Sequence, residues 1–292
     1  MYSLQVFQFL NLLCLVTLGF LTAHMYLPFI HIIALLLFSL FMEHLFIYIK
    51  EQQITYISSS ALTTSLGVIL MMVTPHIWVY MIVITLGLAQ KHIIIYKHQH
   101  LFNPSNFALI ATLVFYYKDA HIVLGQLGDD VWLAVAVIVF GSVILWKASR
   151  WIISLSFIIG YLIFQYIGMV QNDPVLHFED ITERFYSVSF IVFTLFMLTD
   201  PRTTPSKPLY QLFFGVGIAL GVSTMDYYYG FRIQHLFMVL FILTPASIFL
   251  HSYSYKKENH SLILFAFVLL SLVVSAIIYI EIQPPYYFTM DG

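Results

Sequence analysis

The sequence predicts an all-α polytopic membrane protein, built from an inverted repeat of two five-helix units plus an extra C-terminal helix. The first observation is composition: 61% of the 292 residues are hydrophobic and 9% are charged, too few charges to cover a soluble domain of this size. The second is a series of continuous apolar runs, and the third is a set of first-half motifs that returns in the second half. We therefore expect a single membrane domain over residues 1–292.

The apolar runs predict the helices in chain order. Because the runs are continuous, they fit helices and not the alternating strands of a membrane β-barrel. Runs of spanning or near-spanning length cover residues 5–23, 27–49, 76–96, 131–147, 151–170, 185–199, 208–224, 233–250 and 261–280. Two shorter runs, 60–73 and 104–117, are polar at one end, which predicts helices that begin below the membrane surface.

An internal repeat relates the first ten predicted helices. The His-Leu-Phe sequence at 100–102 matches the one at 235–237, and the turn at Pro75 matches the turn at Pro201. The first unit, the second unit and the additional helix cover residues 1–118, 131–252 and 261–280. Because five helices is an odd number, the second unit enters the membrane from the opposite side, which predicts inverted halves with a site between them.

The positions of Lys and Arg predict the orientation. With the N-terminus inside, nine of these residues fall in inner loops, and only Lys118, Arg184 and Arg232 fall outside. The positive-inside rule then places the C-terminus outside. We expect the bacterial inner (cytoplasmic) membrane as the location and the lipid bilayer as a partner, and we expect no nucleic-acid partner.

No metal site is predicted. Cys14 is the only cysteine, which excludes an intrachain disulfide and any thiolate cluster supplied by this chain alone. His31 and His44 are weak haem-ligand candidates, since thirteen residues on one helix separate them by about 20 Å. The candidate facing pairs are sixteen residues apart, which mismatches the heights: His76 with His92, and His235 with His251.

Two predicted helix starts are candidate ligand sites. A start below the surface points backbone N–H groups and a positive dipole end into the protein, which suits an anionic or carbonyl-rich ligand. The first start contains Ser60, Thr63 and Thr64. In the second, Pro104 fits the first helical position with Asn103 as its cap, although Asn103 and the serines can also serve only as interfacial caps.

Several motifs support one another in order along the chain. They are Lys91, HLFNPSNF at 100–107, MLTDPRTTP at 197–205 and GVG at 215–217. Together they resemble the flavin-carrying membrane family that includes the D-type component of Rnf electron-transport complexes and the B-type component of the sodium-pumping NADH:quinone reductase. The resemblance covers roughly residues 30–250. It implies a ten-helix inverted-repeat core that carries flavin and passes electrons between neighbouring subunits.

One segment departs from that family. The family holds FMN covalently on a Thr in a Ser-Gly-Ala-Thr-like motif between helices 5 and 6, whereas residues 118–130 contain no Ser or Thr. Covalent flavin is therefore not expected at that site. We expect a non-covalent flavin, either FMN or riboflavin, and the alternative is a repurposed scaffold that binds another ligand.

The resemblance and the helix geometry together select the site residues. Asn103 and Asn106, three apart on one helix face, are expected to present amide groups to an isoalloxazine edge. Asp200 needs a partner near the membrane, which we expect to be Arg202 or Lys207. The complete predicted cofactor-binding set is Asn103, Asn106, Ser60, Thr63, Thr64, Lys91, Asp200, Thr203 and Thr204. In the alternative interpretation, the segment around Asp200 is a rigid turn needed only for folding.

Glu43 is an ionisable residue within a predicted span. It is either a proton or cation step or a carboxylate that extends to the interface. We favour the second interpretation, because Glu43 lies about two turns from the basic inner loop.

Three function classes fit these observations. The first, which we expect, is a membrane subunit that relays electrons with other membrane and soluble redox subunits and has no self-sufficient catalytic site. The second is a transporter of a small organic solute or cation. The third is an accessory membrane enzyme acting on a lipid-like metabolite.

Overall fold

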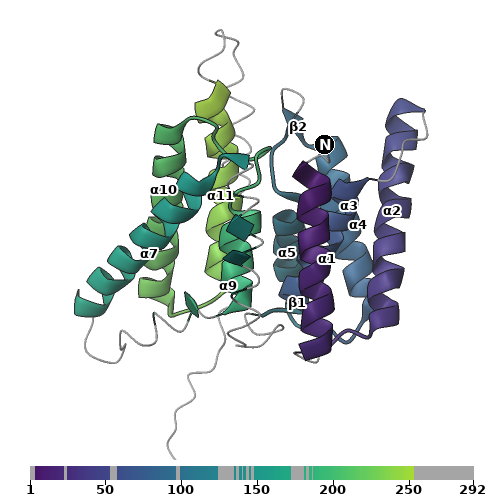
Figure 1. The fold of residues 1–292 in the computed structure, drawn as a ribbon, viewed down its shortest axis with the longest axis horizontal. Helices are drawn as coiled ribbons and strands as arrows, with labels where there is room; N and C mark the ends of the chain where they lie inside the picture. The colour runs from purple at the N-terminus through teal and green to yellow at the C-terminus, as the bar shows by residue number, and fades with distance from the viewer. Residues whose placement is uncertain are drawn as a thin grey trace, which may run out of the picture.

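The computed structural model describes residues 4–22, 25–52, 58–96, 99–123, 148–171 and 187–252, together with residues 135, 138, 139, 141, 142, 145, 181, 184 and 185. This part of the chain is mostly helical (Figure 1). The helix predicted at 261–280 lies outside the described residues, as do most positions of the helix predicted at 131–147 and of the segment 118–130.

Five helices of the first half form a bundle around α3. The helices are α1 (Leu4–Thr22), α2 (Phe29–Glu51), α3 (Ser59–Met71), α4 (Ile77–Ile93) and α5 (Pro104–Phe115). Helix α3 contacts the other four and is buried on nearly every side after its first turn, as expected of a helix that is apolar all round. Gly67 permits the close approach of α5, because a Cβ there would lie 3.0 Å from the Cβ of Ser105.

The second half is organised around α10. Its described elements are α7 (Trp151–Gln171), α9 (Val188–Val192), the π-helical turn η1 (Phe193–Met197), α10 (Pro208–Tyr229) and α11 (Gln234–Ser252). Helix α10 packs against α7 and α11. Two of its glycines make these contacts possible: a Cβ on Gly215 would lie 2.6 Å from the carbonyl oxygen of Ile153, and one on Gly221 would lie 2.7 Å from Val239 Cγ1.

The apolar run 185–199 does not form the single α-helix that the sequence predicts. Helix α9 has five residues and continues as η1, where the N–H of Leu198 donates to the carbonyl of Phe193. The carbonyl of Thr194 accepts from the hydroxyl of Ser154 on α7, and the Thr194 hydroxyl itself bonds back to Phe190. Side-chain bonds of this kind compete with the regular helical ladder.

Two short antiparallel ladders connect the helices of the first half. Strand β1 (Met72–Val73) pairs with β4 (His121–Ile122), with Met72 opposite Ile122, which joins the ends of α3 and α5. Strand β2 (Ile95–Tyr96) pairs with β3 (Gln99–His100), with Ile95 opposite His100. The second ladder reverses the chain after α4 and brings His100 to the start of α5.

Three described helices are long and apolar enough to cross a membrane: α2, α7 over Trp151–Val170, and α10. They expose many large apolar side chains, including Leu37, Phe41, Ile163 and Phe213, which a lipid environment would cover. Helices α1, α3, α4, α5 and α11 are shorter and apolar. A polytopic helical membrane protein fits these properties.

The two halves meet where α5 contacts α11. The Asn106 side-chain amide donates to the carbonyl of Phe237 at 3.2 Å, and the Phe102 ring stacks on Phe241 with centroids 4.5 Å apart. The turn at Pro201 lies beside the first turn of α3, whereas the turn at Pro75 follows the last residue of α3 and strand β1. The two proline turns therefore lie at opposite ends of α3.

Candidate functional site

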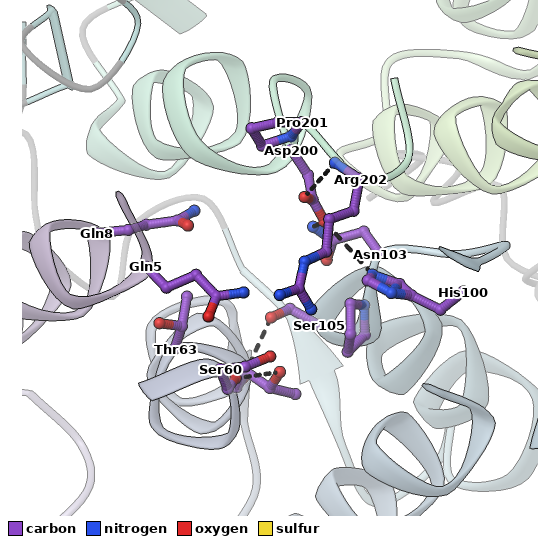
Figure 2. A pocket seen from close by; sticks show the side chains of 12 residues that line it. Gln5, Gln8, Ser60, Thr63, His100, Asn103, Ser105, Asp200, Pro201 and Arg202 are labelled. Carbon is purple, nitrogen blue, oxygen red and sulfur yellow. Dashed lines mark hydrogen bonds and ion pairs between the residues drawn. The ribbon is translucent and has the colours of Figure 1, made fainter. Parts of the chain in front are cut away.

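A polar cavity of about 320 Å³ lies between α1, the starts of α3 and α5, and the Pro201 turn (Figure 2). Its lining residues come from both halves of the chain: Gln5, Gln8, Ser60, Thr63, Thr64, His100, Asn103, Pro104, Ser105, Asp200, Pro201 and Arg202. Five of the nine predicted site residues are among them, namely Ser60, Thr63, Thr64, Asn103 and Asp200. The other four, Asn106, Lys91, Thr203 and Thr204, lie behind the lining.

The first turns of α3 line the cavity, and the start of this helix is capped. Ser58 is the N-cap, and its hydroxyl accepts from the N–H of Ala61 at 3.4 Å. The Thr63 and Thr64 hydroxyls donate to backbone carbonyls one turn earlier. Their hydroxyl oxygens therefore still have acceptor capacity toward the cavity.

Asn103 caps α5 as the sequence predicts. Its Oδ1 accepts from the N–H of Asn106 at 3.1 Å, and Pro104 occupies the start of the helix. Its Nδ2 donates to Asp200 Oδ2 at 3.1 Å. Asn106 is fully buried and bonds to α11, so the two amides do not form the shared ligand-facing edge expected from their spacing.

Asp200 joins the two halves through Asn103, and of its two expected partners Arg202 bonds to it through the backbone. Its Oδ1 accepts from the backbone N–H of Arg202 at 3.1 Å, a local bond typical of Asp in a turn. The Arg202 guanidinium extends instead toward Gln5, whose amide oxygen accepts from it in the orientation that satisfies both groups. Lys207 is exposed, and its Nζ lies over the ring of Tyr210.

Thr203 and Thr204 hold the turn together and do not line the cavity. The Thr204 hydroxyl donates to the Asp200 carbonyl at 2.6 Å and accepts from Arg150 Nε at 3.3 Å. The Thr203 carbonyl accepts from Ser247 of α11 at 2.8 Å. For these two residues, the geometry matches the alternative interpretation of a rigid turn.

Lys91 belongs to a buried charge cluster directly behind the cavity, which we call the Glu43 cluster (Glu43, Lys91 and His92). Lys91 Nζ lies 2.5 Å from Glu43 Oε1, and His92 Nε2 lies 3.2 Å from Glu43 Oε2. Lys91 Nζ also donates to Ser60 Oγ at 3.3 Å. The Glu43 side chain is only 4% exposed, so the interpretation of a carboxylate that extends to the interface is wrong. The Lys91 ammonium on α4 offsets part of the free-energy cost of burying the Glu43 carboxylate.

A second buried charge cluster, which the sequence interpretation missed, lies in the other half. We call it the Asp226 cluster (Tyr161, Gln165, Arg184, Asp226 and His235). Asp226 accepts from Arg184 Nη1 at 2.9 Å and from Gln165 Nε2 at 2.6 Å, and it lies 2.7 Å from His235 Nδ1. Arg184 is 3% exposed, so it is a buried partner of Asp226 and not an exposed loop cation. The signal available in the sequence was His235, the first residue of the repeated His-Leu-Phe motif.

His100 is the one cavity-lining residue with an unsatisfied buried nitrogen among the described residues. The residue is 6% exposed, and its Nε2 has no hydrogen-bond partner there, with Asp200 Oδ2 at 3.9 Å. Burial lowers the pKa of His100 to about 4, against the opposing effect of Asp200 and together with Arg202, Lys91 and His92. The imidazole is therefore neutral at pH 7.

The haem candidates do not converge on a ligand site. His31 and His44 are half-buried on α2, and His44 Nδ1 lies 2.6 Å from the carbonyl oxygen of Leu40. Three of the proposed facing histidines have other contacts: His76 stacks on Trp78, His92 bonds to Glu43 and His235 bonds to Asp226. No group of three or more His, Cys, Asp or Glu in the described part of the chain could hold a metal ion.

The fold and the site together define a helical membrane protein with a polar cavity between two helix bundles. In comparisons with protein-family models and with curated proteins, nothing matches the chain.

Proposed function

We propose that this chain is a membrane subunit of a redox system, which binds a non-covalent flavin or a similar heterocycle in the cavity and relays electrons across the membrane with partner subunits. One observation carries the proposal. The two motifs on which the resemblance depends, residues 100–107 and 197–205, are far apart in the sequence but meet at the cavity through the bond between Asn103 and Asp200.

The groups around the cavity fit a heterocycle with a polar edge. The buried His100 Nε2 lacks a partner among the described residues, and Gln5, Gln8 and Arg202 supply amide and guanidinium groups to the same space. The volume lies at the small end of the range of about 300–1,000 Å³ for small-molecule sites, which suits one ring system better than a dinucleotide. When bound, a flavin would supply the one- and two-electron chemistry that no side chain here provides.

The proposal includes inverted halves in the bacterial inner membrane, with the N-terminus inside. Helix α4 ends near the cavity, where Lys91 bonds to Ser60, whereas its counterpart α10 begins just after the Pro201 turn at that cavity. Each has the corresponding neighbours, α2 and α5 for α4, and α7 and α11 for α10. Opposite directions with equivalent neighbours are what an inverted repeat requires.

A transporter of a small polar solute or cation is the second candidate. One observation favours it: apart from His100, the cavity lining has no aromatic ring among the described residues on which a flavin would stack, and ten of the twelve lining residues have amide, hydroxyl, imidazole or charged side chains. A polar chamber between inverted halves is typical of transporters.

An absorption spectrum and mass spectrometry of the gently solubilised, full-length protein test the first candidate. We expect bound flavin in the wild type and its loss in Thr63→Phe, which fills the cavity. Thr85→Phe is the matched control, because Thr85 is half-buried on α4 and does not line the cavity. A wild type without flavin, or equal flavin in both variants, would contradict the proposal. Solute uptake into proteoliposomes without any reductant would instead favour the transporter.

A further inference from the structure

Two helices begin at the cavity. Ser60, Thr63 and Thr64 from the first turns of α3 line it, and so do Pro104 and Ser105 from the first turn of α5. The first N–H groups of a helix have no partner within the helix, and the macrodipole places partial positive charge there. Helices α3 and α5 therefore direct positive potential into the same space, as at many sites that bind anions.

A full positive charge reaches the same space. Figure 2 shows the Arg202 side chain extending from the Pro201 turn across the cavity, toward Gln5 and Ser60. Its backbone N–H is used by Asp200, but the guanidinium is held only by the Gln5 amide among the contacts described. A planar guanidinium matches phosphate and carboxylate oxygens in bidentate geometry.

His100 gives separate evidence for a ligand in the cavity, which does not depend on the helix starts or on Arg202. Its ring is buried, it lines the cavity, and its Nε2 has no hydrogen-bond partner among the described residues. Buried polar atoms in native proteins nearly always have a partner, so an orphaned nitrogen at a cavity indicates that a ligand or water binds there. In its Nε2-protonated tautomer, the neutral ring donates to an oxygen.

The described carboxylates near the cavity, Asp200 and Glu43, already have hydrogen-bond or ion-pair partners. Asp200 is the only carboxylate in the lining that the structure describes, and its oxygens accept from Asn103 Nδ2 and from the Arg202 backbone. Glu43, behind the lining, is paired with Lys91. Arg150 contacts the other side of the Pro201 turn through Thr204. The described residues around the cavity therefore include three cations (Lys91, Arg150 and Arg202) and two carboxylates (Glu43 and Asp200), which gives a net positive charge.

From this combination we infer that the cavity recognises a negatively charged group, a phosphate or a carboxylate carried by its ligand, and does not bind the ligand through a neutral ring edge alone. The inference rests on the proposed function only in that flavins are chosen as the test ligands. Applied to flavins, it selects FMN over riboflavin, because the two share one ring system and differ by a phosphate.

Titration of the flavin-free protein with FMN and with riboflavin, followed by quenching of flavin fluorescence, tests the inference. We expect FMN to bind at least tenfold more tightly. Arg202→Gln should bring the two affinities within about twofold, because it removes the charge and keeps a side chain with N–H donors. Lys207→Gln is the matched control, since it removes a charge from an exposed position in the same loop and should leave the ratio unchanged. Size-exclusion profiles check that both variants are folded.

Thermal stabilisation by inorganic phosphate separates the two proposals. Equal affinities for FMN and riboflavin in the wild type would overturn the inference and leave the proposed function standing. If neither flavin binds, but phosphate raises the melting temperature of the wild type and not of Arg202→Gln, the inference holds and the proposed function fails. If neither the flavins nor phosphate bind, both are overturned.

Discussion

Lys91→Met removes the cation that faces Glu43 and so tests the Glu43 cluster directly. The two side chains are 9% and 4% exposed, so Glu43 is left buried without its main partner. Removing one member of a buried ion pair costs about 3–5 kcal/mol. We expect the lower end of that range, because His92 Nε2 remains 3.2 Å from the other carboxylate oxygen. A loss of about 3 kcal/mol lowers the melting temperature by roughly 6–12 °C in a chain of this size.

Thermal unfolding of the detergent-solubilised protein measures this loss. The double variant Glu43→Gln, Lys91→Met should recover much of the stability, since it leaves no buried charge in this pair. Lys50→Met, at the exposed end of α2, makes the same chemical change and should stay within about 0.5 kcal/mol of the wild type. A Lys91→Met protein as stable as the Lys50→Met control, or single losses that simply add in the double variant, would refute the reasoning.

Three further predictions concern backbone contacts, caps and pH. Gly215→Ala should destabilise the protein by about 1–3 kcal/mol in thermal unfolding, because the new Cβ would lie 2.6 Å from the Ile153 carbonyl oxygen. Gly217→Ala is the control and should be nearly neutral, because its Cβ would lie 3.7 Å from the nearest atom, Leu243 Cδ1. Asn103→Ala removes the α5 cap and should cost about 1–2 kcal/mol in the same assay; an unchanged melting temperature would contradict the capping role. The pKa of His100 is lowered to about 4, so the unfolded chain binds a proton at that residue below about pH 6.5, whereas the folded chain binds it only below about pH 4. The free energy of unfolding should therefore fall by up to about 3 kcal/mol as the pH drops from about 6.5 to about 4. His100→Gln should remove that part of the pH dependence.

The helices were predictable where the limits of an apolar run lie within two residues of the limits of a helix. The run 27–49 corresponds to α2 (Phe29–Glu51), and the run 151–170 corresponds to α7 (Trp151–Gln171). Hydropathy reports on burial or lipid contact, but it carries no information about backbone hydrogen bonding. The change from α9 to η1 was therefore not predictable, and the contact that Ser154 makes there, to the Thr194 carbonyl, comes from forty residues away in the chain.

The site was predictable where a residue also had a local structural role. Asn103 could be assigned as a cap because the following Pro104 marks a helix start, and Ser60 and Thr64 belong to a similar start. Gln5 and Gln8 were missed, although their spacing of three on one helix face was an available signal. The partners of Glu43 depend on how distant helices pack, which a single sequence does not show.

The Glu43 cluster also constrains how the chain is made. Glu43 and Lys91 are 48 residues apart in the chain, and Arg184 and Asp226 are 42 apart. At a synthesis rate of about 5–20 residues per second, each lone charge emerges from the ribosome roughly 2–10 s before its counter-ion. During that interval, helix α2 in its final position would hold a carboxylate without its counter-ion, which is unfavourable in lipid. Insertion of this protein should therefore proceed in groups of helices, with α2 held at the insertion machinery until α4 arrives.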